Sequence, residues 1–371
     1  MNINLKKVVN YNFHKHFVLK NNPAKNILDI SNKLIGLHSA RLITPFATLI
    51  PRLNKFSTFD LQNEITKKTA LIKLRCMRKT LHLVSIPMAP IVHNATLNLR
   101  LSDCINFYKR NKYSELDIKT VSDLILNIVH TQGCSSFTIL KSLKTNYEEN
   151  FIKIVIKELW EKGTLCYVNN SQNWQKEYRL YDLTQRVYPN LDLNSIEISD
   201  AQEILILTHI DSFGPVTVKD ISWWSGLPIG TIKKTMSKYK TDIVNVSIEG
   251  HNESFYMSLA DYDKYVGFIN SDKSWISLLA YEDPTLKGYY ESRYRYIDKK
   301  YYSKLFNRIG EARASIVKNG KVIGIWTWNK ETQQIEYKMF EKLTINDKKR
   351  LASEIKKTNE CLKLVVDYSN I

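Results

Sequence analysis

The chain has 371 residues, which is enough for two or three domains with an ample hydrophobic core. Lysine and arginine total 54 against 37 aspartates and glutamates, a formal net charge of +17 at pH 7. This excess favours a polyanionic partner, with nucleic acid ahead of an anionic membrane surface. The alternative is that the lysine-rich composition reflects only an AT-rich genome. The apolar runs are far too short to cross a bilayer, so we expect no membrane partner.

The five cysteines stand far apart, and none is spaced for zinc binding with another cysteine or a histidine. Their odd number and the lack of a signal peptide fit a reducing cytosol. We therefore expect a cytoplasmic protein without a metal or an organic cofactor. The sequence also lacks a glycine-rich phosphate loop, paired catalytic carboxylates and a Ser-His-Asp pattern, which argues against nucleotide hydrolysis and ester chemistry.

Residues 1–110 are expected to form an N-terminal winged-helix-like module, in which a helical bundle is followed by two strands. The pattern predicts helices over residues 5–18, 24–35, 44–53 and 60–69, and strands over residues 71–77 and 80–85. Pro87 then opens a further helix, because the first turn of a helix tolerates proline.

Residues 111–195 show the most regular pattern, that of a second winged helix. Apolar residues recur at helical spacing over residues 118–130. The pattern then predicts, in order, a short helix capped by Ser135 or Ser136, a helix over 149–162, and strands over 164–168 and 177–181.

The same order returns over residues 196–265, which predicts a third winged helix. Its helices are expected over residues 200–212, 217–225 and 228–240, and its strands over 243–248 and 254–259. The third helix of a winged helix commonly enters the major groove of DNA. Lys233 and Lys234 on this helix are therefore candidate DNA contacts.

Residues 266–371 are expected to form a β-rich domain with a closing helix. Strands are predicted over 276–280, 316–318, 321–328 and 334–340, a helix over 346–357 capped by Asn346, and a last strand over 362–366. Asn319-Gly320 lies between two of these strands and is a strong signal for a two-residue hairpin turn.

Two short segments carry a resemblance to a known family. They read Gly36-Leu37-His38-Ser39-Ala40-Arg41 and Met77-Arg78-Lys79-Thr80-Leu81-His82-Leu83-Val84. Together they resemble the signature of the winged-helix DNA glycosylases of alkylation and interstrand-crosslink repair (AlkZ/YcaQ type), and stretches at 221–228, 278–293 and 317–326 follow in the family's order. The resemblance implies an α+β fold of tandem winged-helix (helix-turn-helix) modules around a small C-terminal β-barrel-like sheet, with a concave basic surface for double-stranded DNA.

The family resemblance also implies an activity in DNA repair. It implies a monofunctional DNA glycosylase, a hydrolase that cleaves the N-glycosidic bond of N7-alkylated purines, with interstrand crosslinks as a further substrate. Such an enzyme would need no cofactor and would act as a monomer associated with the nucleoid. The signature segment holds no Schiff-base lysine, so strand-cleaving lyase activity is not expected.

The family usually carries two polar side chains in the first segment, at the positions of His38 and Ala40 in this chain. An imidazole with a near-neutral pKa is able to act as general base, so His38 is the candidate catalytic residue. Ala40 cannot hold a water molecule. The alternative function is therefore a non-catalytic winged-helix protein, either a lesion binder or a transcriptional regulator.

Further residues are candidate DNA contacts or supports. Alternating aromatic and basic side chains at 289–296 suit backbone contacts and stacking on bases. The alternative is a strand with tyrosines on one face and arginines on the other. Asp283 is expected to orient an arginine rather than to touch the substrate. Besides the two lysines above, the candidate DNA contacts are Ser39, Arg41, Arg78, Thr80, Tyr289, Arg293 and Arg295.

Overall fold

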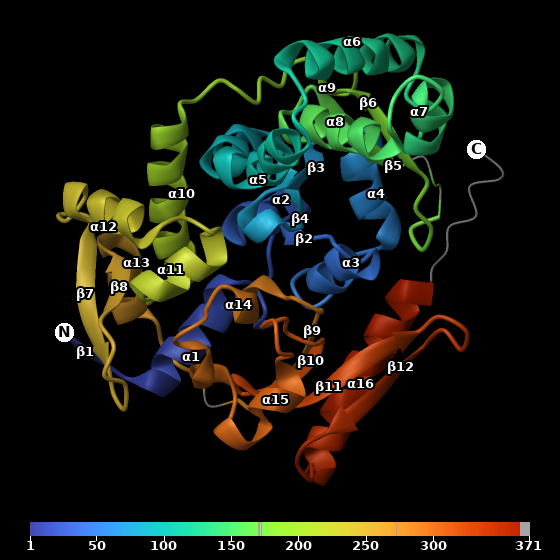
Figure 1. Ribbon diagram of the computed structural model, residues 1–371. Coiled ribbons are helices and arrows are strands. Elements are labelled where there is room, and N and C mark those ends of the chain that lie inside the picture. The colour runs from blue at the N-terminus through green and yellow to red at the C-terminus, as the bar shows by residue number, and fades with distance from the viewer. Residues whose placement is uncertain (170, 172, 272, 364–371) are drawn as a thin grey trace.

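The computed structural model describes residues 1–169, 171, 173–271 and 273–363 (Figure 1). The fold is mixed α+β. Figure 1 shows the N-terminal unit, mostly blue, near the centre, a second unit above it, a third to its left and the C-terminal sheet at the lower right. No helix within the described ranges is long and apolar enough to cross a membrane.

The first elements, β1 (Asn2–Ile3) and α1 (Leu5–Lys15), pack against the third unit. β1 pairs in parallel with β7 (Ile243–Ile248). On α1, the ammonium of Lys15 lies 2.7 Å from the carboxylate of Asp261. The start of the chain is thereby joined to a segment about 240 residues away.

The N-terminal unit has the order helix, strand, helix, helix, strand, strand. Its elements are α2 (Ile27–Lys33), β2 (Leu37–His38), α3 (Ile43–Leu49), α4 (Thr58–Thr66), β3 (Leu71–Arg75), η1 (Met77–Lys79), β4 (Leu81–Ser85), η2 (Ile86–Met88) and the long α5 (Ala89–Asn111). The strands form an antiparallel sheet of order β2-β4-β3. The predicted helices and the two predicted strands are confirmed, whereas β2 lies between two predicted helices and was not predicted.

The second unit contains α6 (Glu115–Thr131), α7 (Ser136–Leu143), α8 (Glu149–Glu161), β5 (Leu165–Asn169), β6 (Arg179–Leu183) and α9 (Thr184–Val187). The apolar faces of its helices form a separate core around Val121, Ile125 and Ile152, as their helical spacing predicts. The Ser135 hydroxyl accepts a hydrogen bond from the Thr138 backbone N–H, so Ser135 is the cap.

The third unit contains α10 (Ile198–Phe213), α11 (Val218–Ser225), α12 (Ile229–Lys238), β7, β8 (Phe255–Ser258) and α13 (Leu259–Gly267). A bridge between Val216 and Tyr256 adds an extended segment before α11, and a bridge between Cys134 and Tyr181 does the same before α7. All three units therefore share one order: a helix, a short extended segment, two helices and two strands.

The C-terminal part contains an open four-stranded antiparallel sheet of order β12-β11-β10-β9. Its elements are β9 (Ile276–Leu279), α14 (Pro284–Lys287), η3 (Arg293–Tyr296), η4 (Lys299–Tyr301), α15 (Tyr302–Leu305), β10 (Ser315–Lys318), β11 (Lys321–Asn329), β12 (Gln334–Met339) and α16 (Ile345–Lys363). The expected barrel-like closure is wrong, because β9 and β12 are opposite edges of the sheet and α16 packs against both of them.

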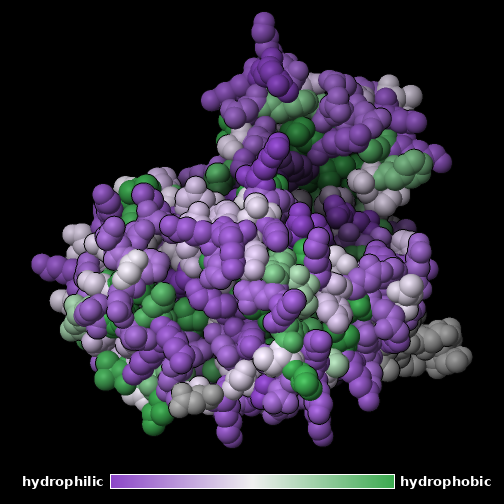
Figure 2. Space-filling model, turned by 90° about the horizontal axis from the view of Figure 1, so that it is seen from below, coloured by the Kyte–Doolittle hydropathy of each residue, from purple (hydrophilic) through white to green (hydrophobic). Residues whose placement is uncertain are grey.

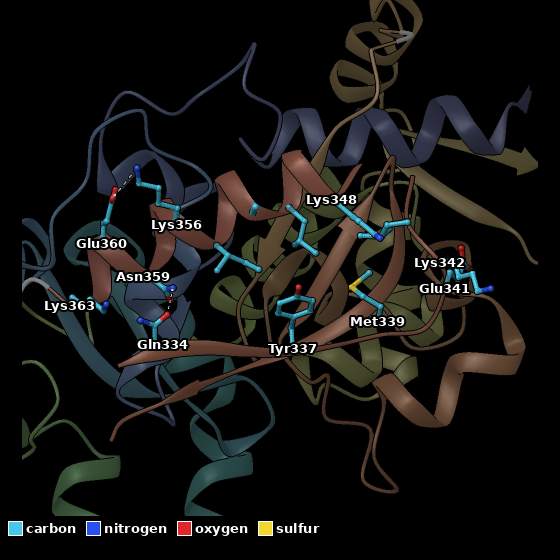
Figure 3. Close-up of a pocket in the computed structure, with 14 residues that line it drawn as sticks. Gln334, Tyr337, Met339, Glu341, Lys342, Lys348, Lys356, Asn359, Glu360 and Lys363 are labelled. Carbon is cyan, nitrogen blue, oxygen red and sulfur yellow. Dashed lines mark hydrogen bonds and ion pairs between the residues drawn. The ribbon is translucent and has the colours of Figure 1, made fainter. Parts of the chain in front are cut away.

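The closing helix α16 is longer than predicted. The Thr344 hydroxyl accepts a hydrogen bond from the Asp347 backbone N–H at 3.2 Å, so Thr344 rather than Asn346 caps it. The helix includes residues 362 and 363, where a strand was predicted, and the rest of that strand lies outside the described residues. Figure 3 shows side chains of β12 and α16, among them Tyr337 and Asn359, around an open hollow of about 730 Å³.

Candidate active site

The two histidines of the signature segments meet across a pair of strands. His38 ends β2, and its Cα partner on β4 is His82. Gly36 has a φ of +96°, and a Cβ there would lie 2.7 Å from Cγ1 of Val84, so only glycine lets β2 come this close to β4. The two imidazole rings stand perpendicular, with their centroids 5.4 Å apart.

His38 and His82 line a narrow hollow together with a segment of the C-terminal part. The other polar lining side chains are Arg78, Thr80, Glu282 and Lys287. The hollow has a volume of about 20 Å³, which is room for roughly one water molecule. Within the part of the chain that the structure describes, Nδ1 of His38 has no hydrogen-bond partner.

The surroundings keep the His38 imidazole neutral. Burial is the main cause that lowers the pKa of His38 well below its ordinary value, and the charges of Lys287, Arg41 and Arg78 act in the same direction. The near-neutral pKa expected for His38 is therefore wrong. A neutral imidazole still forms hydrogen bonds with water, but at this lowered pKa it is a weak general base.

His82 is a second neutral imidazole in the same place. Its Nδ1 lies 3.2 Å from the Thr80 carbonyl oxygen and 3.4 Å from Cys76 Sγ. In the tautomer that donates to the carbonyl oxygen, Nε2 is left as an acceptor. Burial lowers the pKa of His82 to about 4. Thr80 itself turns its hydroxyl to the Met77 carbonyl oxygen at 2.9 Å.

Two of the residues after His38 line wider cavities than the hollow. Ala40 and Arg41 are exposed, and the Arg41 guanidinium stacks 3.5 Å from the centre of the Tyr281 ring. Arg41 lines a cleft of about 800 Å³, and the buried Ser39 lines another of about 270 Å³. Figure 2 shows a mostly hydrophilic surface with a hollow between a larger body and a smaller lobe.

Three cations surround one indole ring beside the hollow. The Trp223 ring centre lies 3.9 Å from the Arg78 guanidinium, 4.7 Å from that of Arg293 and 4.8 Å from the Lys287 ammonium. Arg78 lies in the turn η1 rather than on a strand, at a φ of +51°. In the described residues, Nη1 of Arg78 and Nη2 of Arg293 have no hydrogen-bond partner.

Within the aromatic and basic run at 289–296, Tyr289, Arg293 and Arg295 lie under the surface, contrary to the expectation that they contact DNA, whereas Tyr290 and Tyr294 are exposed. The three buried side chains are at most 1% exposed, and residues 293–296 form the 3-10 turn η3. The Tyr289 hydroxyl donates to the Phe213 carbonyl oxygen at 2.7 Å, and Arg295 donates to that of Pro215 at 3.0 Å. The run therefore joins the third unit to the C-terminal part.

Asp283 is fully buried and holds an arginine. It forms a bidentate ion pair with Arg52 at 2.7 and 2.9 Å, and it accepts a hydrogen bond from the Thr285 backbone N–H at 3.0 Å. Lys233 and Lys234 lie exposed on α12 and do not line the hollow.

His82, Glu282 and Lys287 were not predicted as site residues. His82 lies in the second signature segment, and the other two flank Asp283 in a family-like stretch, so sequence proximity was the available signal. Among the described residues, no group of three or more His, Cys, Asp and Glu side chains is placed to hold a metal ion.

Comparison with known proteins shows the family of this chain. Residues 32–360 match the family model described as DNA glycosylase AlkZ-like. The chain belongs to the AlkZ-like DNA glycosylase family. The resemblance seen in the sequence is thus confirmed, and the AlkZ-like protein is assigned to the DNA glycosylase class of enzymes, which act in DNA repair.

A solved structure shares the whole fold of this AlkZ-like protein. The Streptomyces sahachiroi DNA glycosylase AlkZ has a TM-score of 0.79 and 16% sequence identity, with 98% of this chain and 97% of that chain covered. At this identity the likeness shows the fold alone. A search of curated proteins finds no match.

Proposed function

We propose that this protein excises N7-alkylated purines from duplex DNA, including bases in interstrand crosslinks, with His38 orienting the attacking water. The observation that carries the proposal is the neutral His38 imidazole, with an unpaired Nδ1, at a hollow with room for roughly one water. Family membership supplies the reaction class.

The reaction needs few catalytic groups from the protein. Alkylation at N7 makes the base cationic and hence a good leaving group without protonation. The enzyme has to place a water near C1′ and tolerate positive charge that develops on the sugar. His38 accepts a hydrogen bond from that water, and Nε2 of His82 offers a second acceptor in place of the side chain that Ala40 lacks.

The repeated order of elements supports a proposal for how the protein binds DNA. We interpret the three units as winged helices, with α12 and its Lys233 and Lys234 facing the duplex. Two residues that follow His38 in the chain, Ser39 and Arg41, would contact the damaged strand. Two residues that line its hollow, Arg78 and Thr80, would do the same. We propose a monomer that works on nucleoid DNA.

The test uses a duplex with a single N7-methylguanine, followed by alkali and detection of strand scission. Wild type is expected to excise the base, His38→Ala to lose most of that activity, and His38→Gln to retain it, because an amide also orients water. His130→Ala, an exposed histidine on α6, is the matched control. Equal excision by wild type and His38→Ala would exclude the role of His38.

The second candidate function is lesion binding without excision, which is favoured by the exposed and apolar Ala40. It predicts no scission by wild type together with preferential binding of alkylated over intact duplex. A transcriptional regulator would instead prefer one sequence, whether damaged or not, at every salt concentration.

A further inference from the structure

Lys287 is a lysine inside the candidate active site. It ends α14, its side chain is 12% exposed, and it lines the same hollow as His38 and His82. Its ammonium forms an ion pair with Glu282, donates to the Gly310 carbonyl oxygen at 3.3 Å and lies over the Trp223 ring. The segment 282–287 thus adds an amine and a carboxylate to the histidines.

The Lys287–Glu282 pair is able to exchange a proton. Burial lowers the pKa of Lys287 to about 8, and burial raises the pKa of Glu282. Both shifts favour the neutral forms, so burial of the pair promotes transfer of the proton to the carboxylate, which frees the amine. A neutral amine next to a developing aldehyde is a nucleophile.

We propose that Lys287 forms a Schiff base with C1′ of the abasic sugar left after base excision, which makes the protein an abasic-site lyase as well as a glycosylase. The proposal rests on the proposed function. His38 orients water toward C1′ only if the sugar lies at the mouth of this hollow, and the same position brings C1′ to Lys287. It revises the expectation of a monofunctional enzyme. That expectation was based only on the signature segment, whereas Lys287 lies outside it.

The reaction balances without any cofactor. The Lys287 amine adds to the C1′ aldehyde of the ring-opened sugar. Glu282 then returns the proton as the carbinolamine loses one water, which gives an iminium ion and restores the Glu282 carboxylate. The Glu282 carboxylate removes a C2′ proton, and the C3′–O bond breaks with its electrons leaving on the phosphate oxygen. Water then hydrolyses the unsaturated imine and returns the free amine. The iminium ion carries the same positive charge as the Lys287 ammonium, so the Trp223 ring and the Glu282 carboxylate stabilise both cations.

Lys73 provides a matched control elsewhere in the fold. Its side chain is 11% exposed, it pairs with Glu177 at 2.8 Å, and burial lowers its pKa as it does that of Lys287. It faces a different cavity, which His38 does not line. A reactivity that arises merely from a buried lysine–glutamate pair would therefore appear at Lys73 as well.

The experiment incubates the protein with a duplex that contains a preformed abasic site and adds sodium borohydride, which reduces an imine to a stable amine. Wild type and Lys73→Met are expected to give a covalent protein–DNA complex, and Lys287→Met to give none. Peptide mapping of the wild-type complex should place the DNA on Lys287, a result that holds even if Lys287→Met fails to fold. A complex that persists in Lys287→Met, one that maps to another amine, or no complex at all would overturn the proposal.

Two further results separate this proposal from the proposed function. A preformed abasic site needs no base excision, so trapping without excision of N7-methylguanine would refute the glycosylase proposal alone. Excision without trapping would refute the lyase alone. Glu282→Gln should still trap, because burial and the nearby Arg78 and Arg293 keep the pKa of Lys287 low without the carboxylate. It should lose strand cleavage, and cleavage at the wild-type rate would exclude Glu282 as the base for C2′.

Discussion

At the residue scale, the site depends on two imidazoles that are kept neutral. His38 and His82 face each other because β2 and β4 pair in register, and burial together with the charge of Lys287 lowers the pKa of both. A protonated imidazole would add repulsion to the charge of the alkylated base and the sugar. Neutral imidazoles avoid this repulsion and still hydrogen-bond water.

The pH profile of excision should reflect this neutrality. Since the pKa of His38 lies well below 6.5, its imidazole stays neutral as the pH falls from 8 to 6, and we expect a flat single-turnover rate. An ordinary histidine would be half protonated near pH 6.5. His38→Gln, which does not titrate, corrects for effects on DNA binding. A decline centred near pH 6.5 in wild type but not in His38→Gln would contradict the prediction.

Residue roles were predictable from the sequence only where neighbours in the chain carry them. His38 and Arg78 lie in the signature segments, and the structure brings both to the hollow. The burial of Tyr289 and Arg295 was not predictable, because alternating aromatic and basic residues suit an exposed strand equally well. Their partners are backbone carbonyls about 75–80 residues away, which no local pattern encodes.

At the element scale, helices were predicted better than the pairing of short strands. The helices of the second unit follow from apolar spacing and serine caps, which are local properties. β2 has two residues, and it is a strand only because β4 supplies its hydrogen bonds. The barrel-like closure failed for a related reason, since α16 rather than a strand packs against both edge strands.

The ion pair of Arg52 and Asp283 joins the N-terminal unit to the start of α14, the helix that ends at Lys287. Both side chains are fully buried, so Asp283→Ala leaves an uncompensated guanidinium and is expected to lower the free energy of unfolding by about 3–5 kcal/mol. Asp298→Ala, an exposed aspartate nearby in the sequence, should change it by less than about 0.5 kcal/mol. Urea unfolding measures the change in unfolding free energy for both variants. Equal changes would show that the ion pair does not stabilise the contact between the N-terminal unit and α14.

At the scale of the whole molecule, buried histidines make the fold sensitive to acid. Burial lowers the pKa of His82 to about 4 and those of His93 and His209 to about 3. The unfolded chain binds protons at these sites from pH 6.5 downward, whereas the folded chain does not. Stability is therefore full above pH 6.5 and falls as the pH drops toward the folded values, by about 2 kcal/mol per histidine at pH 5.

Urea unfolding at pH 7.5 and pH 5 tests this sensitivity. His93→Gln retains an acceptor for Arg100, which lies 3.3 Å from His93 Nδ1, but removes one titrating group. The loss of unfolding free energy between the two pH values should therefore be smaller in the variant by the contribution of one histidine. An unfolding free energy that is the same at both pH values in wild type would contradict the assignment.

The positive charge of the molecule is distributed unequally between two helices that occupy the same place in their units. On α12, Lys233 and Lys234 are exposed, and neither has an ion-pair partner in the described ranges. On α8, Lys153 and Lys157 already pair with Glu149 and Asp103. Of these four lysines, only Lys233 and Lys234 are without an ion-pair partner among the described residues, and they are therefore free to replace counterions on DNA phosphates.

Lys233→Ala combined with Lys234→Ala should lower the slope of log affinity against log salt by about 2 in absolute terms, since each lost phosphate contact removes nearly one released counterion. Lys153→Ala combined with Lys157→Ala is the charge-matched control on α8 and should leave the slope nearly unchanged, because its ammonium groups are already paired within the protein. Fluorescence anisotropy of a labelled duplex from 50 to about 300 mM salt gives both slopes. If the two double variants lose slope equally, the duplex meets a diffuse positive surface; if only the α12 variant does, this helix faces the DNA.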